Sequence, residues 1–170
     1  MAGAREPRRE ALGAEVATDL VHPGAWAPVS LVPRKDGTVA RFPHLIERAK
    51  PGFLAVDATG RRFVNEADSY HDFCMGMFRA GLGEAWLVAD DRFVRTYGLG
   101  LVMPGGRRLK RLLRAGYIVS AADLSALASQ IGVDAGGLQK TVAAHNVDAK
   151  GGEDHAYGRG SSVLNRFNGD

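Results

Sequence analysis

Several features that would place a chain in a common functional class are missing from this sequence. Cys74 is the only cysteine among 170 residues, so an internal disulfide and a cysteine-based metal site are both excluded. No apolar run approaches the roughly 18 residues that a membrane-spanning helix needs. The charged N-terminus lacks the apolar segment of a signal peptide. These absences predict a protein without a membrane span and favour a cytoplasmic location.

Two binding motifs are also absent. Gly-x-Gly-x-x-Gly, the turn that seats a dinucleotide pyrophosphate on a helix N-terminus, occurs nowhere in the chain. The nearest approach is Gly98-Leu99-Gly100, which no helix N-terminus follows at the required spacing. The histidines lie singly, without the spacing of metal ligands, so we assign no metal site.

What is present is the composition of one soluble domain. Apolar residues make up 45% and charged residues 24% of the chain, and 170 residues suffice for one hydrophobic core. The net charge is +3, and much of the basic excess lies between residues 92 and 114. Such a cluster could bind nucleic acid or an anionic substrate, or could be a solvated helix face or a surface that packs on a domain missing from this chain. Because no nucleic-acid motif with interleaved aromatics accompanies it, we predict no nucleic-acid partner.

Periodicity and turn residues predict an α+β fold, a small mixed domain of β-hairpins and short helices. The first predicted hairpin joins strands 26–32 and 39–42 through a turn at Asp36-Gly37. The second joins strands 53–56 and 62–64 through Ala58-Thr59-Gly60. Two further short strands are expected at 86–89 and 117–119.

Capping residues and apolar spacing predict the helices. Asp68 or Ser69 caps a helix over 70–80, whose buried side is expected to carry Phe73, Met77 and Phe78. The other expected helical segments, with their caps, are 91–97 after Asp90, a turn at 110–114, a helix from Ser120 to about Gln130, and a helix from Asp134 to Gly151-Gly152. Residues 153–170 are expected to be rich in loops.

A cluster of polar side chains follows the predicted strand 62–64. Glu66 and Tyr70 are four residues apart, so a helix that begins near Ala67 would turn both toward one cleft. A phenol ordinarily has a pKa near 10, too high for a base at neutral pH unless the phenolate is stabilised. The residues alone equally allow a buried, hydrogen-bonded tyrosine and a glutamate in a salt bridge.

The stretch Gly60-Arg61-Arg62-Phe63-Val64-Asn65-Glu66-Ala67-Asp68-Ser69-Tyr70-His71-Asp72-Phe73 resembles a family motif. It is similar to the motif in the substrate-covering (capping) domain of FAD-dependent dehydrogenases of the fumarate reductase and 3-ketosteroid dehydrogenase superfamily. Further similarities run in the same order to the C-terminal end, so that the resemblance spans roughly residues 24 to 170. They include Ala85-Trp86-Leu87-Val88-Ala89-Asp90, Gly116-Tyr117 and Gly158-Arg159-Gly160-Ser161.

The resemblance implies an oxidoreductase that uses FAD. Tyr70 matches the tyrosine that removes a proton alpha to a ketone while hydride leaves to the flavin, and Glu66 matches a carboxylate beside the substrate. Substrate contacts are expected from four further residues, Asn65, Ser69, His71 and Tyr117, and a structural tie between lobes from Arg159. Fumarate reductases have an arginine soon after this glutamate. In this chain no arginine occurs between Glu66 and Arg79. A dicarboxylate needs such fixed cations, so a ketone or enone substrate is favoured.

The resemblance also implies a division of the chain. We expect a weakly ordered segment over residues 1–23, the capping (substrate) domain over 24–157, and a return segment over 158–170 that leads toward a missing FAD-binding domain. The expectation is therefore a fragment of a larger flavoenzyme, inactive alone and unable to retain FAD. The alternative is a non-catalytic ligand-binding or interaction module derived from such an enzyme.

Overall fold

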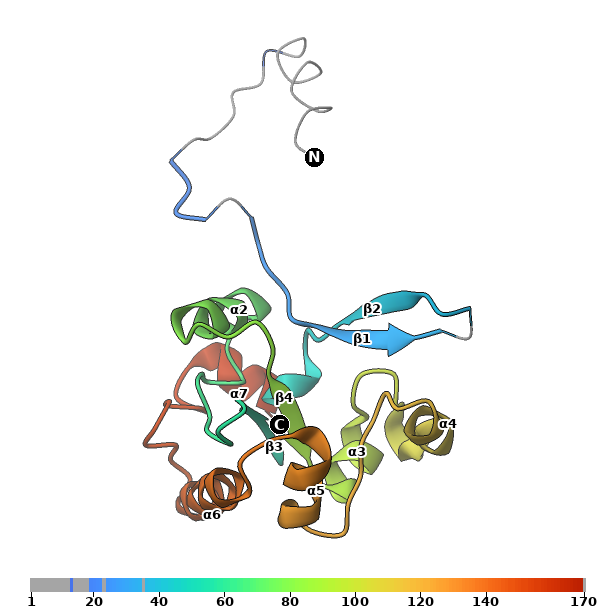
Figure 1. Cartoon of the computed structure of the whole chain (residues 1–170). Coiled ribbons are helices and arrows are strands. Elements are labelled where there is room, and N and C mark those ends of the chain that lie inside the picture. The colour runs from blue at the N-terminus through green and yellow to red at the C-terminus, as the bar shows by residue number, and fades with distance from the viewer. Residues whose placement is uncertain (1–12, 14–18, 23, 35, 170) are drawn as a thin grey trace.

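The computed structural model describes Gly13 and residues 19–22, 24–34 and 36–169. These residues form two separate two-stranded antiparallel sheets, and the helices gather around one of them (Figure 1). The predicted α+β class is thereby confirmed. Most of the segment 1–23, for which weak order was expected, lies outside the described residues.

The first sheet is the hairpin β1–β2, made of Val29–Pro33 and Val39–Pro43. Its strands pair antiparallel, as the predicted hairpin requires, with Pro33 opposite Val39, and the first strand begins at Val29 rather than at residue 26. The turn is held by Asp36, whose carboxylate accepts hydrogen bonds from the amide and the hydroxyl of Thr38. Gly37 supplies the positive φ of 80° that this turn requires. The hairpin extends beside the main body of the molecule (Figure 1).

The second sheet differs from the predicted one. Its strand β3, Phe53–Val56, is completely buried and pairs with β4, Trp86–Ala89, instead of with residues 62–64. The predicted turn after β3 does form, since the amide of Asp57 donates to the carbonyl of Arg61 at 3.0 Å. Residues 62–64 then leave the sheet without forming a strand.

Charged side chains on the other edge of β3 explain this difference. The Glu66 carboxylate accepts a hydrogen bond from the Ala55 amide at 3.1 Å. The Arg159 guanidinium donates to the Phe53 carbonyl at 2.6 Å. Because these side chains satisfy the backbone groups that a neighbouring strand would have paired, the edge is closed to residues 62–64. Val64 packs into the core instead, against Ala55 and Phe73.

Helix α2, Tyr70–Arg79, begins where the sequence predicted. Ser69 caps it by accepting a hydrogen bond from the Asp72 amide at 3.1 Å. Phe73 is buried, but the prediction that Phe78 is buried was wrong, since Phe78 is 52% exposed. Its ring packs edge-on against Trp26, whose position depends on the chain before β1 and could not be read from the helical period.

Helix α3, Asp91–Tyr97, is capped by Asp90 and ends at Gly98, as predicted. A 3₁₀ turn, η2 (Pro104–Gly106), leads into α4, Leu109–Arg114. The predicted strand 117–119 is absent. The amides of Tyr117 and Ile118 both donate to the Leu112 carbonyl, so the chain winds around the end of α4. This half of the molecule shares a core of six buried residues: Phe53, Phe93, Val94, Leu99, Val102 and Leu112.

Two further helices, α5 (Leu124–Ile131) and α6 (Ala135–Gly151), lie beside one another on the lower side of the molecule in Figure 1. Asp123 caps α5, so the prediction that Ser120 is its cap was wrong by three residues. Asp134 caps α6 as predicted. Both helices pack on β3 through one buried cluster, which comprises Val56, Ala128, Val133 and Leu138.

The C-terminal stretch contains a helix that the sequence did not predict. Helix α7, Val163–Gly169, lies against the 3₁₀ turn η1, Glu47–Ala49. Among the described ranges, no helix is both long and apolar enough to cross a membrane.

Candidate functional site

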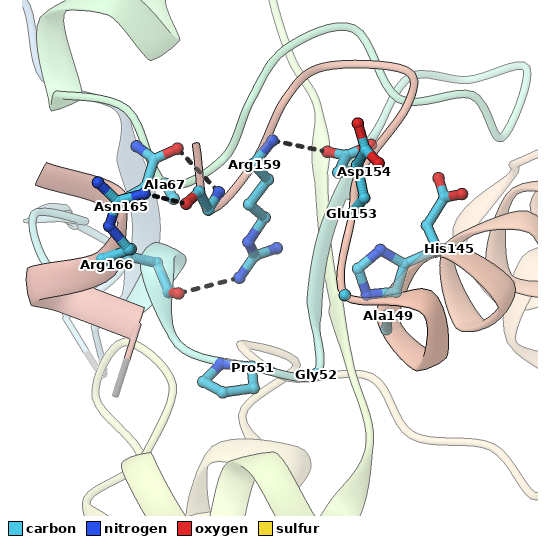
Figure 2. Close-up of a pocket in the computed structure, with 14 residues that line it drawn as sticks. Pro51, Gly52, Ala67, His145, Ala149, Glu153, Asp154, Arg159, Asn165 and Arg166 are labelled. Carbon is cyan, nitrogen blue, oxygen red and sulfur yellow. Dashed lines mark hydrogen bonds between the residues drawn. The ribbon is translucent and has the colours of Figure 1, made fainter. Parts of the chain in front are cut away.

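A pocket of about 280 Å³ opens where the start of β3, the end of α6 and the segment before α7 meet (Figure 2). Figure 2 shows Arg159 at its centre, with Asn165 and Arg166 on one side and Asp154 and His145 on the other. The remaining lining residues are Ala49, Pro51, Gly52, Ala67, Asp148, Ala149, Gly152, Glu153 and Gly160.

A buried network of ion pairs lies behind the pocket. The Arg62 guanidinium donates to both carboxylate oxygens of Glu66, at 2.8 and 2.6 Å, and to both oxygens of Asp154, at 3.0 and 2.8 Å. Arg159 lies 3.6 Å from the Glu66 carboxylate. The Glu66 side chain is fully buried, and those of Arg62 and Asp154 are only 6% and 7% exposed. Two positive and two negative charges therefore compensate one another away from water.

The pKa values of Arg62 and Asp154 shift in the directions that keep both side chains charged. Burial alone would lower the pKa of Arg62, but its hydrogen bonds to Glu66 and Asp154 raise it above the ordinary value. Burial alone would raise the pKa of Asp154, but the hydrogen bond and charge of Arg62 lower it to about 2. Both groups are consequently ionised at neutral pH.

Arg159 binds backbone carbonyls as well as Glu66. Its guanidinium donates to the carbonyls of Phe53 and Lys50, at 2.6 and 2.7 Å, and to those of Ala49 and Arg48, at 3.1 and 3.3 Å. Burial lowers the pKa of Arg159, and the nearby Glu66 opposes this effect. Within this chain Arg159 joins the C-terminal stretch to η1 and β3, and the predicted tie between lobes stays a prediction. Its donors are committed to the protein.

A second buried arginine fixes the loop that precedes α2. Arg48 is 1% exposed and donates to the carbonyls of Glu66, at 2.8 Å, and His44, at 3.2 Å. It also lies over the ring of Phe73, 4.8 Å from the centroid. Burial lowers the pKa of Arg48, and nearby carboxylates oppose this effect. Through these contacts Arg48 holds the loop 65–68 in one conformation.

Asn65 lies in this loop, and only 8% of its surface is exposed. Its side-chain amide donates to Asn165 on α7 at 2.8 Å, and its oxygen accepts from the Ala67 amide at 3.0 Å. Asn165 in turn donates to the Asp68 carboxylate at 3.0 Å. The loop is thus tied to α7, about one hundred residues away in sequence. These contacts place Asn65 in the framework of the site, and its predicted contact with substrate stays a prediction.

The helix that was expected to turn Tyr70 and Glu66 toward one cleft begins at Tyr70 rather than near Ala67, and neither residue lines the pocket. Tyr70 is the first residue of α2 and is 40% exposed, whereas Glu66 is 0% exposed. The salt bridge that the sequence left open for Glu66 is present, and its predicted role beside the substrate stays a prediction. Ser69 next to Tyr70 donates its hydroxyl to Asp72 at 2.8 Å. His71 accepts a hydrogen bond from the Trp26 amide at 3.1 Å.

Tyr117 lies apart from this segment. Its hydroxyl hydrogen-bonds to Ser30 on β1 at 2.6 Å. It also lies so close to Gly100 that a Cβ there would come within 2.2 Å of the hydroxyl. The described hydrogen bonds of Tyr117 do not reach residues 65–71, and its predicted contact with substrate stays a prediction.

His145 on α6 lines the pocket, and one nitrogen of its ring lacks a hydrogen-bond partner. Its Nδ1 atom is buried without a hydrogen-bond partner. Burial, reinforced by the charges of Arg159 and Arg62, lowers the pKa of His145, so the ring is neutral at physiological pH. No group of side chains that could hold a metal ion occurs among the residues that the structure describes.

Sequence reasoning missed the partners that organise the site, namely Arg48, Asp154 and Asn165. Arg48 lies before the motif, and Asp154 and Asn165 lie about 90 to 100 residues after it; no local pattern links them to Glu66 or Asn65. Arg62 offered one signal, since it lies four residues before Glu66, directly before the apolar pair Phe63-Val64, and a buried charge needs a partner.

Comparison with known proteins decides the family. The sequence model of the FAD binding domain family matches residues 2–167, almost the entire chain. The chain belongs to this FAD binding domain family. The motif resemblance to FAD-dependent oxidoreductases is confirmed, while the assignment to a capping domain in particular is not tested by this match.

Relatives within the family are dehydrogenases. The chain is 45% identical to 4-oxocyclohex-2-ene-1-carboxylate 5-dehydrogenase of Sinomonas cyclohexanicum over 86% of its own length and 26% of that protein's. It is 36% identical to 3-oxosteroid 1-dehydrogenase of Mycobacterium tuberculosis over 95% of its own length and 29% of that protein's. The chain therefore spans about a quarter of the length of the curated relatives it matches.

A solved structure agrees. The crystal structure of 3-ketosteroid delta1-dehydrogenase from Sterolibacterium denitrificans, in complex with 1,4-androstadiene-3,17-dione, matches with a TM-score of 0.71 and 33% identity. The match covers 85% of this chain and 27% of that chain.

Proposed function

We propose that this chain is the substrate-covering domain of an FAD-dependent dehydrogenase that acts on a CH–CH bond next to a carbonyl. The observation that carries the proposal is the position of Tyr70. This residue is exposed on the first turn of α2, next to the loop 65–68, which the buried side chains of Arg48 and Asn165 hold in place. Family membership and the names of the relatives support the reaction class.

The described residues do not fit the pyrophosphate of FAD by themselves. Their strands form two antiparallel pairs, and a strand followed by a glycine-rich turn and a helix does not occur among them. We infer that FAD is bound mainly by protein outside this chain, in the longer enzyme that the relatives' length suggests. When bound, FAD supplies the hydride acceptor.

The role of this chain in that enzyme would be proton transfer and exclusion of water. A helical side chain leans toward the helix N-terminus, where the partial positive charge favours an anion. As a phenolate, Tyr70 would accept the proton alpha to a substrate ketone and become a neutral phenol, and the electron pair of the broken C–H bond would enter the new C=C bond. Glu66, as a member of the ion-pair network, would support the loop that leads to Tyr70. Further contacts with a ketone or enone substrate would come from Ser69, His71 and Tyr117, with Asn65 holding the loop.

A chimera tests this function. We would replace the matching segment of the Sinomonas 4-oxocyclohex-2-ene-1-carboxylate 5-dehydrogenase with this chain, which is 45% identical to it. The chimera should dehydrogenate the relative's substrate with a dye as electron acceptor. Tyr70→Phe should then lower kcat by about 10²- to 10⁴-fold, the usual contribution of a positioned acid or base. Tyr97→Phe, on α3, is the matched control and should leave kcat unchanged.

The outcome distinguishes the two interpretations of the chain. A chimera that binds FAD and turns over equally well with Tyr70→Phe would remove Tyr70 from catalysis. A chimera that folds and binds FAD but never turns over would favour the alternative, a non-catalytic ligand-binding or interaction module.

A further inference from the structure

One exposed surface of the molecule takes no part in the proposed chemistry. We call it the basic surface; it comprises Arg107, Arg108, Lys110, Arg111 and Arg114, all of them exposed. The sequence contains no acidic residue between Asp91 and Asp123 but seven arginines and lysines. The rest of the chain therefore has 15 basic and 19 acidic residues, a net charge of −4, against +7 for this stretch.

The fold presents these cations on the outside of α4. Leu112 is 4% exposed and anchors the helix in the core, so Lys110, Arg111 and Arg114 face solvent. Residues three and four apart are neighbours on a helix, which brings these three side chains together. Within the part of the chain that the structure describes, no carboxylate forms an ion pair with the basic surface; Arg95 on the adjoining α3 pairs with Asp91.

The backbone at Arg108 gives a second, independent indication. Arg108 has a φ of 70° and is the only residue other than glycine with a positive φ among the described residues. Glycine adopts this conformation freely, whereas an L-residue does so at a steric cost. The chain uses glycine at Gly105 and Gly106, just upstream, but places an arginine here. An arginine kept at a position that glycine would fill without strain supports a role for this side chain.

We propose that the basic surface docks an acidic surface of another protein. Four of its five cations are arginines, whose planar guanidinium matches a carboxylate with two parallel hydrogen bonds. Met103 is 38% exposed and is paired by its backbone with Arg107. Arginine and methionine are enriched in protein interfaces, whereas lysine is depleted.

The same composition argues against permanent burial by the remainder of a longer enzyme. The core of such an interface is depleted in charged residues, because each charge must lose its water. An exposed cluster of one sign is suited to a reversible complex that forms through complementary charge. The proposal is independent of the chemistry proposed for Tyr70.

A pair of charge-matched variants of this chain provides the test. The surface variant carries Arg107→Gln, Arg108→Gly and Arg111→Gln; the control carries Arg34→Gln, Lys140→Gln and Lys150→Gln at exposed positions elsewhere. Both lose three positive charges. The probe is a fluorescently labelled, glutamate-rich helical peptide, titrated at low and at physiological salt.

The unchanged chain should bind the peptide, with affinity that falls as salt rises. The surface variant should bind about tenfold more weakly, because each exposed ion pair contributes a factor of a few, and the control should bind like the unchanged chain. Equal weakening in both variants would overturn the proposal, since net charge alone would then explain binding. Tighter binding to duplex DNA, or to vesicles of phosphatidylcholine and phosphatidylglycerol, than to the peptide would also overturn it.

Arg108→Gly alone separates binding from folding. It removes one charge and relieves the positive-φ strain, so its melting temperature should equal or exceed that of the unchanged chain while its affinity falls. Undiminished affinity in this variant would contradict the role given to Arg108.

Discussion

Replacing Glu66 by glutamine tests whether the buried ion-pair network stabilises the fold. Glutamine keeps the size of the side chain and can still accept the hydrogen bond from the Ala55 amide. It removes the negative charge that faces Arg62 at 2.6 Å and Arg159 at 3.6 Å. Its amide group would also meet guanidinium donors, which it cannot pair with.

The expected cost follows from the burial of the pair. Removing one partner of a buried ion pair costs about 3–5 kcal/mol, because the other charge is left without compensation. Arg62 keeps its two hydrogen bonds to Asp154, so we expect the lower end, about 3 kcal/mol. A domain of this size has about 5–15 kcal/mol of stability in total. The melting temperature should fall by roughly 6–12 °C.

Urea unfolding followed by the fluorescence of Trp26 and Trp86 measures this change. The midpoint should fall by roughly 1–2 M for Glu66→Gln, with an unchanged slope. The control is Asp91→Asn, which breaks the exposed pair with Arg95 and should leave the midpoint where it was. If Glu66→Gln shifts the midpoint no further than Asp91→Asn, the network does not stabilise the fold and the reasoning fails.

Two further predictions concern acid and the packing of α6. Because the pKa of Asp154 is lowered from 3.8 to about 2, its stabilising effect is complete above about pH 4 and is lost as the pH falls toward 2. The melting temperatures of the unchanged chain and of Asp154→Asn, measured as a function of pH, should therefore converge over this interval. A constant difference between the two melting temperatures would contradict the pairing with Arg62. Gly137→Ala should destabilise the chain by at least 1–3 kcal/mol, since its Cβ would lie 1.9 Å from the Thr59 carbonyl oxygen. Gly136→Ala, with room for a methyl group, should stabilise α6 by about 0.5–1 kcal/mol in the same melting assay, and equal effects of the two substitutions would refute this packing.

The sequence predicted those parts of the fold that neighbouring residues decide. The β1–β2 hairpin formed around Asp36-Gly37, and Asp90 and Asp134 each cap the helix that follows. A cap or a turn joins side chain and backbone within a few residues, so its signal is written locally. The same locality made Tyr70 recognisable within its motif.

The sequence could not reveal which groups would occupy the outer edge of β3. Glu66 reaches that edge from 11 residues away and Arg159 from more than 100 residues away, and together they displace the strand that the turn at Asp57 favoured. The framework of the site has the same origin, since Asn65 is held by Asn165 on a helix that the sequence did not predict.

The sequence by itself therefore determined the α+β class, the caps of α3 and α6, the first hairpin and, by resemblance, the flavin-dependent family. Tertiary structure alone decided that Glu66 is a buried partner of Arg62 and Arg159, and that Tyr70 is exposed beside the loop they help to hold. The reason is physical: the free energy of a buried charge depends on every group that packs around it, and those groups come from distant parts of the chain.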